Sequence, residues 1–231
     1  MALKRSHSNW TKRPTDLEKK IEPYRKYVFI CEGENTENWY FSHLIKMKKE
    51  LGIHPLIEIQ LLEKTEGEKS CSHPKNLVAF AERQKKSLGD KYDKKHDKMV
   101  IVFDTDIYKN KPEDYKDLLK EKGDYIFAIT NPSFELFLLL HYENAFQKHI
   151  EPNMDKILEN LKEGKRRYID KLFSSVSGMN PKKNPKIGLF AEKIDTAIVE
   201  ENHINQEIQS APAKVTSNIG KIIKSIRDDI L

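Results

Sequence analysis

The first part of the chain alternates between short strand-like runs and longer helix-like segments. Four apolar or alternating runs, at residues 27–31, 57–61, 99–103 and 125–129, predict strands. The segments after them have helical spacing and open with helix-starting residues, which are Asn35 or Thr36, Pro74, Pro112 and Asn131-Pro132. Alternation of strand and helix predicts an α/β fold, with a mostly parallel sheet flanked by helices and ligands at the carboxyl ends of its strands.

The pattern changes after residue 150, where strand signals are absent. Helical spacing predicts helices over residues 154–161 and 187–199, and a strongly amphipathic last helix from Ile219 to Ile230. The segment between the first two contains Gly178, Pro181 and Pro185 and is too irregular for one long helix. We therefore predict three parts: a basic flexible arm at 1–22, an α/β domain at 23–150 and a basic helical extension at 151–231.

Composition narrows the class of protein. Of 231 residues, 38% are hydrophobic, which is typical of a globular chain, and the apolar runs are far shorter than the roughly 20 residues of a membrane-spanning helix. The basic start lacks the apolar core of a signal peptide, and two cysteines make no disulfide framework. We expect a cytoplasmic protein without a membrane partner, in which Cys31 is a small buried apolar residue.

Positive charge is concentrated in two segments although the net charge is only +5. Residues 1–26 carry eight Lys and Arg against three acids, and residues 162–186 carry eight against two. Basic patches around a carboxylate-rich centre are typical of proteins that bind phosphates beside metal ions, although ordinary solvated surface also fits. The candidate nucleic-acid contacts in the second segment are Lys165, Arg166, Arg167, Lys171, Lys182 and Lys183.

Acidic residues follow three of the predicted strands. Glu32 comes directly after the first strand, Asp104 and Asp106 follow the third, and Glu135 lies in the first helical turn after the fourth. These positions share one edge of a parallel sheet. Mg²⁺ prefers oxygen ligands and keeps several waters, so two or three carboxylates suffice to bind it. We predict that Glu32, Asp104 and Asp106 bind Mg²⁺, with Mn²⁺ as an alternative.

Three further acids and one histidine have two readings each. Glu34 and Glu37 either favour the positive end of the following helix or contribute to a second metal or a phosphate site. Glu135 has the same helix-start alternative, but its apolar helix makes an unpaired carboxylate costly. His141, on the same helix, is interpreted as a core residue rather than a ligand.

The strings around these acids resemble a known family. An apolar strand ending in Glu32-Gly33 and a later one ending in Asp104-Thr105-Asp106 resemble the Toprim domain of primases, topoisomerases and nucleases. The fuller strings resemble the RloB family of bacterial abortive-infection proteins; they are Phe29-Ile30-Cys31-Glu32-Gly33-Glu34-Asn35-Thr36-Glu37, Val102-Phe103-Asp104-Thr105-Asp106 and Asn131-Pro132-Ser133-Phe134-Glu135. Tyr168 and Lys171 resemble a family Tyr-x-x-Lys element, whereas a usual Asn-Pro-x-Thr is represented only by Ala211-Pro212-Ala213-Lys214.

The resemblance implies a Toprim-like domain over residues 23–150 with Glu32, Asp104, Asp106 and Glu135 as catalytic residues. It further implies Mg²⁺-dependent hydrolysis of DNA or RNA in anti-phage defence, beside a separately encoded ATPase. An inactive Toprim-like regulatory or nucleic-acid-binding subunit is the main alternative. A haloacid-dehalogenase-like phosphatase also uses Asp-x-Asp, but that family usually continues to Thr or Val where this chain has Tyr108. The chain contains no phosphate-loop or dinucleotide motif.

Overall fold

The computed structural model describes residues 24–62, 64 and 73–229. The predicted arm at 1–22 and Cys71 lie outside the described residues. Among the described helices, none has the length and apolarity needed to cross a membrane.

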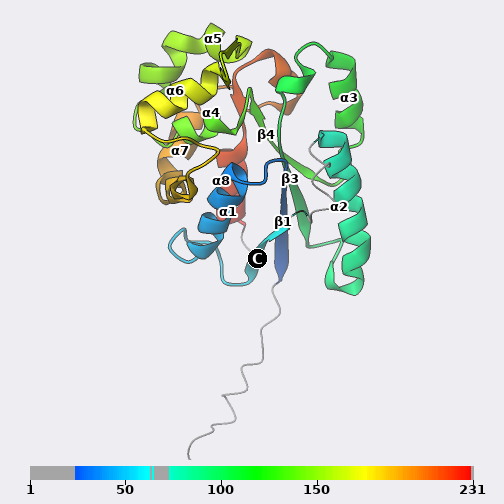
Figure 1. The fold of residues 1–231 in the computed structure, drawn as a ribbon. Coiled ribbons are helices and arrows are strands. Elements are labelled where there is room, and N and C mark those ends of the chain that lie inside the picture. The colour runs from blue at the N-terminus through cyan, green and yellow to red at the C-terminus, as the bar shows by residue number, and fades with distance from the viewer. Residues whose placement is uncertain (1–23, 63, 65–72, 230–231) are drawn as a thin grey trace, which may run out of the picture.

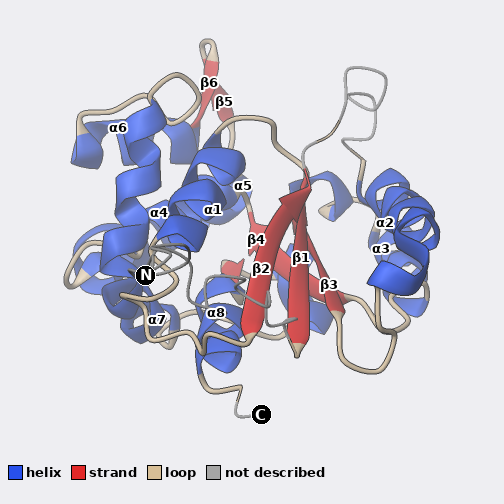
Figure 2. Cartoon of the chain, turned by 90° about the horizontal axis from the view of Figure 1, so that it is seen from below, coloured by secondary structure: helices blue, strands red, loops and turns tan. Residues whose placement is uncertain are grey.

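A five-stranded sheet in the order β2-β1-β3-β4-β7 forms the centre of the fold (Figures 1 and 2). Its four longer strands are parallel, and the two residues of β7 pair antiparallel with the end of β4. The strands are β1 (Arg25–Cys31), β2 (Ile57–Leu62), β3 (Lys98–Asp104), β4 (Ile126–Asn131) and β7 (Thr216–Ser217). A separate hairpin consists of β5 (Lys162–Glu163) and β6 (Arg166–Arg167). The predicted α/β fold with a mostly parallel sheet is confirmed.

Helices cover both faces of this sheet (Figure 1). The α-helices are α1 (Thr36–Lys46), α2 (Pro74–Leu88), α3 (Pro112–Lys120), α4 (Phe134–Leu139), α5 (Met154–Glu159), α6 (Tyr168–Ser177), α7 (Ile194–Glu201) and α8 (Ile219–Arg227). Short 3-10 helices are η3 (Gly89–Lys91), η4 (Asp106–Tyr108), η6 (Glu151–Asn153), η7 (Pro185–Lys193) and η8 (Ile208–Ala213), and η5 (Phe146–Ile150) is a π-helix.

Alternate side chains of the central strands supply two separate cores. Phe29 and Cys31 of β1 pack into a core with α1, α4 and the C-terminal helices, whereas Val28 and Ile30 pack into a core with α2 and α3. Successive residues of a strand point to opposite faces, so a strand buried on both faces is apolar throughout. This explains why β1 and β3 appear in the sequence as unbroken apolar runs.

The region 151–231 departs from the purely helical prediction. It contains β5, β6 and β7, each of two residues, which are too short to give a periodic signal. The helix expected over 187–199 is divided into η7 and α7. Gly188 of η7 packs against α1 so closely that a Cβ there would lie 2.8 Å from the Trp39 carbonyl oxygen, and this tertiary contact, together with the weak helix propensity of glycine, favours the irregular geometry.

Helix α1 is also shorter than predicted. The apolar spacing of Tyr40, Leu44, Met47 and Leu51 in the sequence predicts a helix that stops near Gly52, whereas α1 ends at Lys46. Leu51 is nevertheless buried, because the turns after the helix fold back onto the core. Apolar spacing alone therefore indicated burial correctly and helix length incorrectly.

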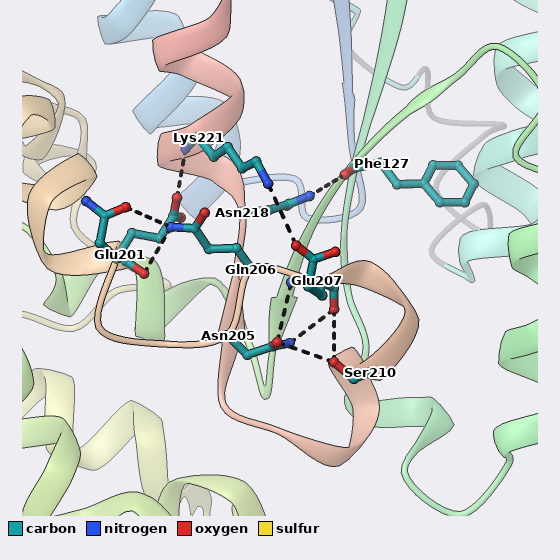
Figure 3. A network of polar contacts seen from close by, with 9 residues as sticks. Phe127, Glu201, Asn205, Gln206, Glu207, Ser210, Asn218 and Lys221 are labelled. Atoms are coloured by element: carbon teal, nitrogen blue, oxygen red, sulfur yellow. Dashed lines mark hydrogen bonds and ion pairs between the residues drawn. The ribbon is translucent and has the colours of Figure 1, made fainter.

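A polar network attaches the C-terminal segment to the sheet (Figure 3). The side-chain amide of Asn218 donates to Phe127 O at 2.9 Å and accepts from Ile129 N at 2.7 Å, which extends the ladder of β4. The carboxylate of Glu201, at the end of α7, accepts from Ser217 Oγ, Gly220 N and Lys221 N at 2.6 to 3.0 Å. It thereby satisfies free N–H groups at the start of α8. The segment 216–221 is consequently fixed against β4.

Candidate metal and nucleic-acid site

A cavity of about 350 Å³ lies at the carboxyl ends of β1, β3 and β4. Parallel strands bring their carboxyl ends to one edge, where ligands of α/β folds commonly bind. The lining residues are Glu32, Gly33, Glu34, Asn35, Thr36, Glu37, Asp104, Asp106, Ser133, Glu135, Arg167, Asp170 and Lys182. All six acids singled out in the sequence therefore meet in one cavity. Their chemical roles remain predictions.

Glu32 and Asp104 lie at the ends of neighbouring strands, as predicted. Glu32 follows β1, and its Oε2 accepts a hydrogen bond from the Asp104 backbone N–H at 3.0 Å. Asp104 ends β3, and its Oδ1 accepts from Thr130 Oγ1 of β4 at 2.5 Å. Burial, with repulsion from Glu37 and Asp106, raises the pKa of Glu32 to about 7 although the Asp104 N–H opposes the shift. Burial and the Glu32 charge raise the pKa of Asp104 well above its usual range.

Asp106 occupies the outer part of the same cavity. It begins η4, and its Oδ2 lies 3.5 Å from Arg167 Nη2, with the side chain of Asp106 21% exposed. Burial raises the pKa of Asp106, while the positive charges of Arg167 and Lys182 act in the opposite direction. The Asp-x-Asp pair is thus divided between a deep carboxylate and a shallower one that already faces a cation.

Glu37 extends from the first turn of α1 back over the strand end. A Cβ at Gly33 would lie only 2.0 Å from Glu37 Oε2, so the absence of a side chain at Gly33 makes room for this carboxylate. Burial and then the charge of Glu135 raise the pKa of Glu37 to about 7. Glu34 also lines the cavity but is exposed. The structure therefore places Glu37 among the buried acids, whichever role it has.

Glu135 follows the fourth parallel strand, β4, and lies in the first turn of α4. Its side chain accepts from Ser133 Oγ at 2.5 Å, and the residue is 4% exposed. Burial and the charge of Asp170 raise its pKa, with Ser133 and Lys182 opposing. An unpaired carboxylate would be costly to bury in the hydrophobic core. The carboxylate of Glu135 is instead directed into the polar cavity.

Asp170 is a cavity residue that the sequence reasoning missed. It lies in the first turn of α6, is buried, and its Oδ2 is 3.6 Å from Lys182 Nζ. The sequence predicts residues 151–231 as a separate extension, and this prediction gives no reason to place their acids in the site. The one available signal was its position between Tyr168 and Lys171, the two residues that resemble a family element.

The structure separates the six predicted nucleic-acid contacts into distinct environments. Arg167 and Lys182 line the cavity. Lys171 pairs with Glu163 at 2.9 Å, and Arg166 donates to Ser174 at 3.3 Å, while Lys165 and Lys183 are exposed. Burial lowers the pKa of Lys182, but Glu135, Asp170 and Asp104 together raise it above its ordinary value. Lys182, although its side chain is 65% exposed, is therefore a cation that faces the carboxylates of the cavity.

The donor set has the chemistry that a hard divalent cation requires. Glu32 and Asp104 are partly or wholly withdrawn from water and repel each other, a cost that a bound cation would relieve. Within the described ranges, no three Asp, Glu, His or Cys side chains are arranged as a preformed metal centre. The residues fit Mg²⁺ by type and by burial, and Glu32, Asp104 and Asp106 are the ones that would hold it.

Two predictions of structural roles are confirmed. His141 is 1% exposed, and its ring nitrogens contact Tyr40 Oη at 2.9 Å and Phe137 O at 3.0 Å. Burial lowers the pKa of His141 to about 3, so it is a neutral core residue. Cys31 is 2% exposed in the core of the sheet.

Comparison with protein families gives one match. The model of the RloB-like protein family matches residues 27–226. The chain belongs to the RloB-like family. The RloB-like match extends from β1 into α8, and so it includes Asp170, Lys182 and the C-terminal network together with the strand-end acids. No curated protein and no solved structure gave a significant match.

Proposed function

We propose that this RloB-like protein is a metal-dependent nuclease that hydrolyses phosphodiester bonds of nucleic acid. The observation that carries the proposal is the meeting of Glu32, Asp104, Asp106 and Glu135 from three strand ends in one cavity that Arg167 and Lys182 also line. Such a cavity combines oxygen ligands for a cation with cations for phosphate oxygens. The order of strand-end acids also supports assigning residues 23–150 to the Toprim type.

Each group has a role in this proposal. Glu32, Asp104 and Asp106 hold Mg²⁺, or Mn²⁺ in its place, which supplies polarisation of the phosphodiester and activation of the attacking water. Lys182 and Arg167 orient the phosphate and neutralise its charge. Glu37, with its pKa of about 7, is suited to exchange a proton with water near neutral pH, and Glu135 beside it assists this exchange or a second cation. Hydrolysis breaks one phosphorus–oxygen ester bond and adds the water oxygen to phosphorus.

The wider setting is also part of the proposal. The RloB-like family is associated with defence and abortive infection. We propose a cytoplasmic role in defence against phage, in which a separately encoded ATPase controls the nuclease. The chemistry of the cavity fits the phosphodiester groups of both DNA and RNA.

The test is a cleavage assay on labelled DNA and RNA, with Mg²⁺, Mn²⁺ or EDTA, with and without any genetically adjacent ATPase. We expect metal-dependent cleavage that falls at least about a hundredfold in Asp104→Asn and in Asp106→Asn, because each loses a ligand charge at the reacting phosphate. Asp117→Asn is the matched control, since Asp117 is on the exposed side of α3 and pairs with Lys120. Absence of cleavage in every condition would instead favour the inactive regulatory subunit.

A further inference from the structure

The hairpin of β5 and β6 projects from the molecule (Figure 2), and its Arg167 lines the cavity. Every residue from Leu161 to Arg167 is exposed, and four of the six residues from Lys162 to Arg167 are basic. Gly164 has φ +69°, which the turn between the two strands uses. The positive charges of this projecting hairpin repel one another. An anionic partner would offset that repulsion.

The base of the hairpin is held in place. Tyr168 N donates to Leu161 O at 3.0 Å, which extends the ladder by one pair. Asn160 is 3% exposed, and its Oδ1 accepts from Ile169 N at 3.1 Å at the start of α6. The orientation of the hairpin relative to α6 and the cavity is therefore defined by hydrogen bonds.

The two faces of the hairpin differ. Lys162 is directly opposite Arg167, and Glu163 is opposite Arg166. Directly opposed residues of an antiparallel pair lie on the same face. Glu163 and Arg166 contact Lys171 and Ser174 of α6, whereas Arg167 contacts Asp106 in the cavity. One face is thus attached to α6, and the face with Lys162 and Arg167 is directed toward the site. Lys162 forms no ion pair with any described residue.

We propose that Lys162 and Arg167 form a binding site for the backbone phosphates of nucleic acid beside the cavity. This inference rests on the proposed nuclease function and specifies how its substrate is held. The pleat of the hairpin selects these two residues from the basic segment, which the sequence alone presented as an undivided patch. Phosphate contacts supply affinity without sequence preference, so the site serves any nucleic acid that reaches the cavity.

Arg167 changes partner in this arrangement. Its contact with Asp106 is 3.5 Å long and joins side chains that are 55% and 21% exposed, so the ion pair contributes little and is easily exchanged. A cation that binds Asp106 displaces the guanidinium, which is then free to bind a phosphate. Binding of the metal at Asp106 and binding of a substrate phosphate at Arg167 thereby strengthen each other.

The first test measures binding of labelled 20-nucleotide DNA and RNA, single-stranded and duplex, by fluorescence anisotropy in EDTA over a series of salt concentrations. Lys162→Ala/Arg167→Ala should weaken binding about tenfold or more at low salt. On duplex DNA it should also lower the slope of log affinity against log salt by about two. Lys165→Ala/Arg166→Ala is the matched control, because it removes the same charge from the same hairpin without altering the cavity-facing side. Equal losses in both double variants, or no binding by the wild type, would overturn the proposal.

The second test follows Mg²⁺ alone by thermal unfolding without nucleic acid. Arg167→Ala should reach its half-maximal stabilisation at several-fold lower Mg²⁺ than the wild type, whereas Arg166→Ala should match the wild type. An unchanged or higher Mg²⁺ requirement in Arg167→Ala would contradict the exchange. A larger loss of binding in Lys162→Ala/Arg167→Ala than in Lys165→Ala/Arg166→Ala, without cleavage in any condition, would support the hairpin site and contradict the nuclease proposal. Cleavage by the wild type, with equal losses of binding in the two double variants, would contradict the hairpin site alone.

Discussion

Carboxylates that are withdrawn from water have opposite surroundings in two regions of this protein, the cavity and the Glu201 network. Glu201, which is 0% exposed, accepts three hydrogen bonds from Ser217, Gly220 and Lys221. Glu32 accepts one from Asp104 N–H and is repelled by Glu37 and Asp106. Both kinds of acid have lost water, and burial raises the pKa of Glu201 as well, but the donors around Glu201 oppose that shift and suit it to a structural role. The strand-end acids have fewer donors, so a bound cation would be needed to compensate their negative charge. This contrast supports a binding role for them.

The largest expected effect is a dependence of stability on pH that originates in the cavity. The folded-state pKa of Glu32 is about 7, above its ordinary value of 4.5, so the folded protein binds more protons than the unfolded chain between these values. The contribution of Glu32, taken as the stability of the wild type minus that of Glu32→Gln, should therefore fall as pH rises from about 4.5 to about 7 in EDTA, by on the order of 3 kcal/mol, whereas buried His141 adds stability over the same rise in both proteins. Urea unfolding across this range measures it.

The reference for the pH experiment is Glu32→Gln, which cannot ionise at this position but keeps the contributions of the other buried groups, which are Glu37, Asp104, Glu135 and His141. Saturating Mg²⁺ should also reduce the loss, because it compensates the ionised carboxylates. A difference between the wild type and Glu32→Gln that is level or rises over this window would contradict the repulsion on which the comparison depends.

The next effect concerns the structural acid. Glu201→Gln should lower the free energy of unfolding by about 2 kcal/mol, because an amide offers one acceptor oxygen and directs its NH₂ group toward N–H donors. Urea unfolding at pH 7 provides the measurement. Glu207→Gln, at an exposed residue 4.0 Å from Lys221, should change stability by less than about 0.5 kcal/mol. Similar values for the two variants would mean that the Glu201 network carries no special stability.

The smallest effect on stability is expected at Asp104. Asp104→Asn should leave the metal-free protein as stable as the wild type or more stable by up to about 1 kcal/mol, because it removes a charge from a repelling group. Mg²⁺ should then raise the unfolding temperature of the wild type more than that of the variant. Thermal unfolding with Mg²⁺ and with EDTA tests both points; equal Mg²⁺ shifts in the two proteins would refute Asp104 as a ligand.

The sequence by itself determined the four parallel strands of the sheet and the identity of the acids at their ends. A strand buried on both faces is an unbroken apolar run, so β1 and β3 were evident, and an acid directly after such a run lies at the carboxyl edge wherever the strand is placed. Glu32, Asp104 and Asp106 were found for this reason. The resemblance to the RloB family, which is confirmed over residues 27–226, rested on the same strings, and the resemblance to the Toprim domain stays a prediction.

Only the tertiary structure decided what the region 151–231 contributes. Asp170 and Lys182 enter the cavity from segments whose periodicity does not indicate it, and β7 is a strand because β4 offers it a partner. The division of the basic segment by the β5–β6 pleat depends likewise on a pairing of two residues per strand. Local periodicity reports which side of an element is buried, because burial follows the repeat of the backbone. It does not report which distant element lies opposite, because that is fixed by packing between segments far apart in the chain.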